Sequence, residues 1–138
     1  MKHLIAEHGL GDKVSTDSAG TSAYHVGEPP DGRSTEAARE RGIDMNGAAR
    51  QFKHRDFHRF DYVLAMDQSN YEALRESAQT PELQAKVHLF RDFDPDSQPG
   101  SEVPDPYYGG PRGFDDVFDI CNAACTGFLT HLREAHSL

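Results

Sequence analysis

The residues best suited to chemistry lie in one short stretch of the carboxyl-terminal third. The stretch runs Val103-Pro104-Asp105-Pro106-Tyr107-Tyr108-Gly109-Gly110 and belongs to a long loop rich in proline and glycine, where function often resides. A carboxylate can transfer protons in catalysis. An aspartate among prolines is ordinarily a turn residue, however, so this stretch alone does not decide between the two roles.

The two cysteines indicate packing rather than reactivity. Cys121 and Cys125 lie four residues apart on an apolar stripe, and we interpret them as core residues. Two cysteines are too few for a disulfide scaffold, and these lack the close Cys or His partners of a zinc site.

A histidine pair has the spacing of metal ligands but departs from the motif. His54 and His58 are four residues apart, yet Arg55 occupies the place of the glutamate in a zinc-protease motif. We therefore expect no metal and no cofactor.

Length and charge narrow the class of protein. A chain of 138 residues has the usual size of one domain. Its formal net charge of -9 disfavours attraction to nucleic acid or to an anionic membrane surface. No apolar run approaches the roughly 20 residues that span a bilayer. We expect a soluble, cytoplasmic protein with no nucleic-acid or membrane partner.

Strand patterns alternate with helix patterns along the chain. The continuous apolar run at 62–66 is typical of a central parallel strand. Ser69-Asn70-Tyr71-Glu72 matches a capping box that opens a helix to about residue 77. Further strands are predicted at 14–18 and 87–90, and further helices at 2–8, 34–41 and 114–135.

This alternation predicts a three-layer α-β-α domain with a parallel sheet. Ligands of such sheets bind beyond the carboxyl ends of the strands, so the loops after Ser18, Met66 and Phe90 should face the site. The first helix pattern has no capping residue before it, which leads us to expect a single domain over 1–138 that is truncated at its N-terminus.

The chain resembles the low-molecular-weight protein-tyrosine phosphatases from its first residues to its last helix. The resemblance rests on the Asp105 stretch together with the segments Thr16-Asp17-Ser18-Ala19-Gly20-Thr21, Val26-Gly27-Glu28-Pro29-Pro30-Asp31, Gly42-Ile43-Asp44-Met45, Ala49-Arg50-Gln51, Phe60-Asp61-Tyr62-Val63-Leu64-Ala65-Met66-Asp67 and Ser69-Asn70.

The resemblance implies a role for five residues. Asp105 matches the general acid that protonates the departing phenolate and then activates water. Tyr107 and Tyr108 would line the slot for the substrate ring, and Tyr24 would supply another aromatic wall. Ser18 matches a residue whose hydroxyl supports the phosphate-binding loop. The implied partner is a phosphotyrosine-containing protein, and the implied oligomeric state is a monomer or weak dimer.

The family's phosphate-binding loop has no counterpart in these residues. In the family it has the form Cys, five residues, Arg, and it follows the first strand. Here Cys121 is followed six positions later by Gly127, and Cys125 by His131. The nucleophilic cysteine, the phosphate-binding arginine and the first strand are therefore missing, and we expect the chain as given to be inactive.

Three alternatives remain open. The chain could be a non-catalytic remnant that acts as a binding protein of the same fold. It could resemble arsenate reductases, which share the fold, although arsenate has no ring for Tyr107 and Tyr108 to stack on. Protein-arginine phosphatases resemble the chain more closely than arsenate reductases do, but their acid loop prefers Phe where this chain has Tyr107.

Overall fold

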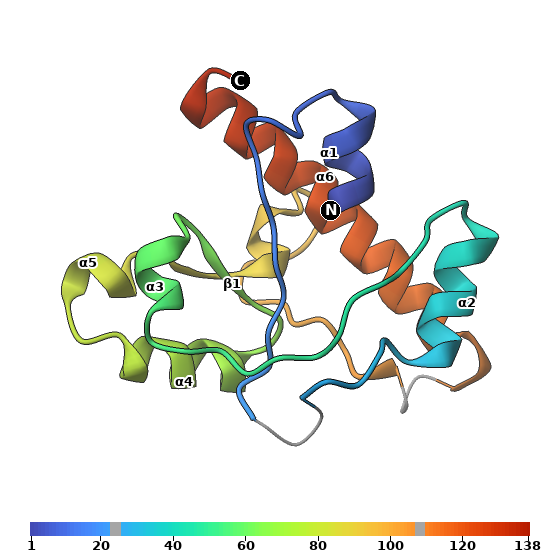
Figure 1. Cartoon of the computed structure of the whole chain (residues 1–138), viewed down its shortest axis with the longest axis horizontal. Helices are drawn as coiled ribbons and strands as arrows, with labels where there is room; N and C mark the ends of the chain where they lie inside the picture. Colours follow the sequence, from blue (N-terminus) through green and yellow to red (C-terminus); the bar gives the residue numbers. More distant parts are fainter. Residues whose placement is uncertain (23–25, 107–109) are drawn as a thin grey trace.

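The computed structural model of the chain describes residues 1–22, 26–106 and 110–138, and Figure 1 shows the arrangement of its helices and strands. The helices are α1 (Lys2–Glu7), α2 (Gly32–Glu40), α3 (Asp56–Arg59), α4 (Gln68–Ser77), α5 (Pro81–Gln84) and α6 (Gly113–His136). The strands are β1 (Val63–Ala65) and β2 (Val87–Leu89), and the 3-10 helices are η1 (Phe90–Phe93) and η3 (Gly110–Arg112).

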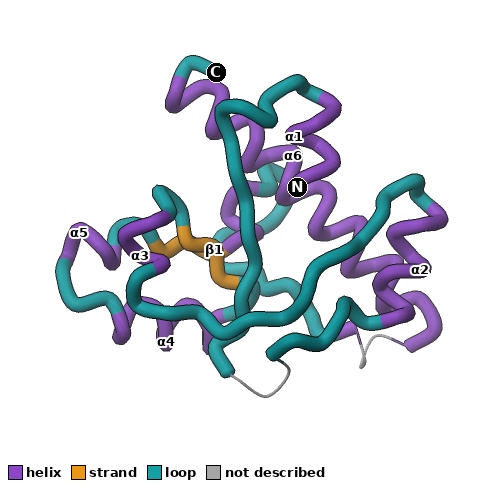
Figure 2. The backbone as a smooth tube through the Cα atoms, in the orientation of Figure 1, coloured by secondary structure: helices purple, strands orange, loops and turns teal. Residues whose placement is uncertain are grey.

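The two strands form a parallel sheet between two layers of helix. Val63 pairs with Val87 and Ala65 with Leu89. Helix α4 packs against both strands, whereas α6 packs against η1, α2 and α1. Figure 2 shows the strands between α4 on one side and α6 on the other. The structure thus confirms the predicted three-layer α-β-α fold, with parallel strands at two of the predicted places.

The core lies where the sheet meets α4. Val63, Ala65, Val87 and Leu89 are buried and pack with Leu74 of α4. Burying a large apolar side chain stabilises a fold by about 1.5 to 3 kcal/mol. The sheet is therefore a rigid base for the loops that follow its strands.

The strand predicted at 14–18 is wrong. In this part of the described chain, the only bridge to another segment joins Gly20 to Gln51. The Gly20 N–H donates to the Arg50 carbonyl at 2.9 Å, and the Phe52 N–H donates to the Gly20 carbonyl at 2.8 Å. A strand requires a neighbour along its length. Residues 14–18 have the composition of a strand but no such neighbour.

The predicted start of α4 is also wrong by two residues. The N-cap is Asp67, whose Oδ1 accepts a hydrogen bond from the Asn70 N–H at 2.7 Å. Ser69 lies inside the first turn. Asp and Ser are both strong N-cap residues, and Asp67 takes the position because its backbone is still extended two residues after the end of β1.

The longest predicted helix is confirmed as α6, which covers the whole of 114–135. Gly127 allows it to approach η1, because a Cβ at this position would collide with the Phe93 carbonyl. None of the helices in the described part of the chain is long and apolar enough to cross a membrane.

Candidate active site

The segment that carries Asp105 is attached to the carboxyl end of β1. The Val103 N–H donates to the carbonyl of Met66, the residue that follows β1, at 2.8 Å. The Gln68 N–H, in the first turn of α4, donates to Oε2 of Glu102 at 2.7 Å. Asp105 follows Val103 by two residues and is exposed. The loop therefore presents this carboxylate at the edge of the sheet where ligands of parallel sheets bind.

The same segment is also hydrogen-bonded to η1, the 3-10 helix that directly follows β2. Nη1 of Arg91, in η1, donates to the Glu102 carbonyl at 2.8 Å. The Gly100 N–H donates to Oδ1 of Asp92 at 2.9 Å. Glu102 is thus held through its carboxylate by α4 and through its carbonyl by η1.

Sequence reasoning did not single out Glu102. Its partners Gln68 and Arg91 lie 34 and 11 residues away. The available signal was general: the free N–H groups at a helix start favour a nearby carboxylate. That signal does not say which carboxylate the fold will bring there.

A close contact fixes the other end of the loop. Gly113, the first residue of α6, lies so close to Pro106 that a Cβ on it would collide with the Pro106 carbonyl. The loop is therefore fixed on both sides of Asp105, at Val103 and at Gly113.

Ser18 lies in a separate polar network. The Ser18 N–H donates to Oδ1 of Asp17 at 2.8 Å, and Oδ2 of Asp17 accepts from Nε of Arg50 at 3.0 Å. Arg50 also donates from Nη1 to Oδ2 of Asp56 at 2.9 Å. The position of Ser18 thus depends on a chain of ionic hydrogen bonds that ends in the interior.

Asp56 anchors this network. Its side chain is fully buried, and Oδ2 also accepts from the Lys53 N–H at 2.8 Å. Burial by itself raises the pKa of Asp56, but the hydrogen bonds from Arg50 and from the Lys53 N–H outweigh it and lower the pKa below its usual value. The same ion pair raises the pKa of Arg50. Asp56 therefore stays ionised.

Three of the predicted site residues, Tyr24, Tyr107 and Tyr108, lie outside the described residues. Their contacts with substrate stay predictions, as do the roles of Asp105 and Ser18.

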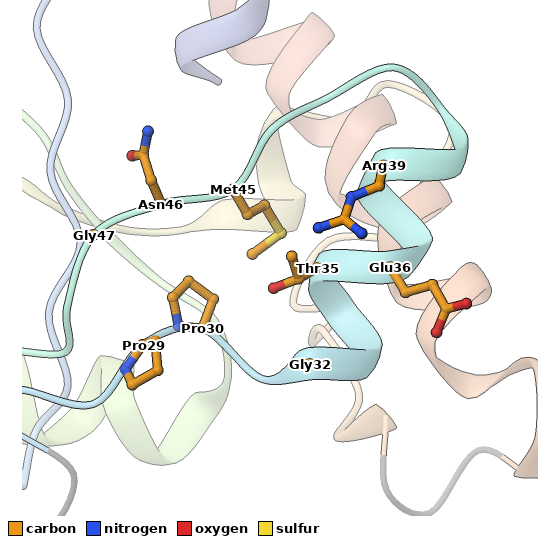
Figure 3. Close-up of a pocket in the computed structure, with 9 residues that line it drawn as sticks. All are labelled: Pro29, Pro30, Gly32, Thr35, Glu36, Arg39, Met45, Asn46 and Gly47. Atoms are coloured by element: carbon orange, nitrogen blue, oxygen red, sulfur yellow. The ribbon is translucent and has the colours of Figure 1, made fainter.

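A pocket of about 610 Å³ lies beside the start of α2. Thr35 and Arg39 of α2 line one side, and Met45 and Asn46 line the other, as Figure 3 shows. Asp105 is not among its lining residues. This pocket therefore is not the substrate site predicted around Asp105.

Cys121 is a poor candidate for a nucleophile. Burial raises the pKa of the Cys121 thiol to about 11, and the neighbouring Cys125 adds to the effect. A thiol attacks as the thiolate, and Cys121 stays protonated at neutral pH.

Residues 1–138 match the family described as low molecular weight phosphotyrosine protein phosphatase. The chain belongs to this family. It is 43% identical over 131 residues to a low molecular weight protein-tyrosine-phosphatase of Streptomyces coelicolor, covering 94% of this chain and 80% of that protein. It is 40% identical over 130 residues to the low molecular weight phosphotyrosine protein phosphatase of Gallus gallus, covering 94% and 81%.

A solved structure confirms the likeness in three dimensions. A protein tyrosine phosphatase of Entamoeba histolytica, crystallised with Hepes in its active site, superposes with a TM-score of 0.89 at 37% identity, covering 98% of this chain and 85% of that one. The family resemblance inferred from the sequence is confirmed. The chain is therefore a member of a family of hydrolases, the low-molecular-weight protein-tyrosine phosphatases.

Proposed function

We propose that Asp105 is the general acid and base of phosphotyrosine hydrolysis through a cysteinyl-phosphate intermediate. A tyrosyl leaving group has a pKa near 10, so protonating it as the P–O bond breaks lowers the barrier. A placed acid contributes roughly 10² to 10⁴ in rate. The observation that carries the proposal is the attachment of the Asp105 segment to the carboxyl end of β1 through Val103 and Glu102.

The substrate we propose is a phosphotyrosine-containing protein, with Tyr107, Tyr108 and Tyr24 against the ring and Ser18 supporting the phosphate-binding loop. Residues 1–138 belong to a single domain of this family, and we propose that the protein is a cytoplasmic monomer or weak dimer. The match to the family over all 138 residues supports the single domain.

We further propose that the 138 residues by themselves carry no phosphatase activity. Neither Cys121 nor Cys125 is followed six positions later by an arginine. Without a thiolate and a guanidinium at the phosphorus, the acid has no reaction to assist. Turnover of para-nitrophenyl phosphate by the purified chain, abolished by vanadate, would contradict this.

The role of Asp105 is testable in a chimera in which a Cys-x5-Arg loop of the family form is added before this chain. Asp105→Ala should lower kcat for a phosphotyrosine peptide roughly 10² to 10⁴-fold. The loss should be smaller for an aryl phosphate with a more acidic phenol, because that leaving group needs less protonation. Asp96→Ala, another exposed aspartate from the preceding loop, is the matched control and should leave kcat unchanged.

Two results would overturn the assignment. Equal losses for both leaving groups would show that Asp105 does not donate the proton. Arsenate reduction by the chimera, without hydrolysis of either phosphate ester, would replace the phosphatase with the reductase alternative.

A further inference from the structure

Three histidines lie around the side chain of one tyrosine where the end of α6 meets the sheet. Oη of Tyr62, directly before β1, lies 2.9 Å from Nε2 of His136 and 3.5 Å from Nε2 of His131. The ring of His88, in the middle of β2, has its centroid 5.9 Å from that of Tyr62. We call Tyr62, His88, His131 and His136 the imidazole cluster. It shares no residue with the proposed catalytic site.

The hydroxyl of Tyr62 can satisfy two neutral histidines or one charged and one neutral histidine. A phenol has one hydrogen to donate, and its oxygen can accept as well. When one imidazole is protonated, its Nε2–H donates to the Tyr62 oxygen and the hydroxyl hydrogen turns to the other imidazole. Both hydrogen bonds therefore survive the first proton.

A second proton breaks this arrangement. With both His131 and His136 charged, two N–H groups compete for the Tyr62 oxygen and the hydroxyl hydrogen has neither imidazole as its acceptor. Two positive charges then face one oxygen atom. Each of these effects favours separation of the histidines from the tyrosine.

His88 gives a third reason why additional protons on the cluster are unfavourable. Burial lowers the pKa of His88, and the charge of a protonated His131 lowers it further. Asp92 of η1 acts in the opposite direction, but its carboxylate already accepts a hydrogen bond from the Gly100 N–H. The ring of Phe93 lies against both His88 and His131, so the space between these two imidazoles is apolar.

We propose that the imidazole cluster is a pH-sensitive lock that holds the last turns of α6 against the sheet and releases them when a second proton binds. The release is local. Upstream, α6 stays attached through the close contact of Gly127 with the Phe93 carbonyl and through the ion pair of Arg41 with Asp115 at 2.9 Å. Downstream, Leu138 packs on the apolar cluster formed by Ile5, Leu10 and Leu129. Opening the lock therefore also loosens the contact of Leu138 with α1, while Leu129 stays in place.

Hydrogen exchange of the 138-residue chain tests the lock. We expect the protection of amides in residues 131–136 to fall about tenfold between about pH 7.5 and about pH 5.5, after correction for the intrinsic rate, since histidine is the side chain that ordinarily gains its charge in this range. Amides of α1 should lose protection as well, while those of β1 and β2 should not.

Three variants make the test specific. His136→Gln keeps a polar side chain that does not titrate, and the pH-dependent loss should shrink to less than about twofold. Tyr62→Phe removes the shared oxygen and should lower protection already at the higher pH. His58→Gln, in α3, changes a histidine outside the cluster and should retain the full loss. The proposal is overturned by equal protection at both pH values in the unchanged chain, by a full loss in His136→Gln, or by a loss spread evenly over the sheet.

Discussion

Two carboxylates anchor loops in this molecule, and they do so in opposite surroundings. Asp56 is fully buried and holds Arg50 and the Lys53 N–H. Glu102 is exposed and accepts from the Gln68 N–H at the start of α4. Both carboxylates accept hydrogen bonds from backbone N–H groups. If its partner is removed, however, the carboxylate of Asp56 has no water to replace it, whereas water can hydrogen-bond to Glu102. Burial therefore decides how much each anchor contributes to stability.

The largest effect is expected from Asp56→Ala. It removes a buried carboxylate that accepts hydrogen bonds from Arg50 and from the Lys53 N–H. Hydrogen bonds to charged groups contribute about 1.5 to 3 kcal/mol each, so we expect a loss of about 3 kcal/mol in the free energy of unfolding. Urea titration measures it. Asp17→Ala removes the other, half-exposed partner of Arg50 and should cost less than about 1 kcal/mol. Equal losses in the two variants would refute the claim that burial separates them.

The second largest effect is expected from Gly113→Ala, which acts on the loop that Glu102 anchors. The added Cβ collides with the Pro106 carbonyl, so backbone must shift, at a cost of about 1 to 3 kcal/mol. Gly11→Ala is the matched control, because a Cβ there meets nothing within 4 Å. Thermal unfolding of both variants checks the difference. A Tm for Gly113→Ala equal to that of the control would mean that the loop moves freely at this end.

Acid should weaken the Asp56 anchor. The folded pKa of Asp56 lies below its ordinary value of 3.8, so its contribution is present above about pH 4 and is lost as pH falls through the folded pKa. Asp56→Asn should be less stable than the unchanged chain at neutral pH, with a difference that narrows on acidification. Urea midpoints measured from neutral pH to about pH 2.5 give the result, and a constant difference would be evidence against the ionised anchor.

The smallest effect on stability is expected from Glu102→Ala. An exposed hydrogen bond to a helix N-terminus contributes about 0.3 to 1 kcal/mol. The local effect should be larger, since the Val103 N–H next to it should exchange faster with solvent. Glu82→Ala, in α5, is the control and should leave Val103 unaffected. Unchanged exchange at Val103 in Glu102→Ala would show that Glu102 does not hold the loop.

Local sequence patterns predicted which helices and strands are present more reliably than they predicted the first and last residues of each. The apolar run at 62–66 and the period of 114–135 located β1 and α6, because burial on both faces or along one stripe leaves a pattern in neighbouring residues. The capping signal was ambiguous, since Asp67 and Ser69 both suit an N-cap and only the end of β1 selects Asp67. Helix α5 was missed although Thr80 caps it and Pro81 begins it, because four residues carry no measurable period.

The sequence by itself determined the family, the layered fold and the identity of Asp105 as the predicted acid, since motif residues and periodic patterns are local properties of the chain. Only the tertiary structure decided that residues 14–18 form no strand, that Glu102 and Arg91 hold the acid segment, and that three histidines meet at Tyr62. These features join residues between 11 and 74 positions apart. No local pattern encodes such pairings, because they arise from the packing of elements against one another.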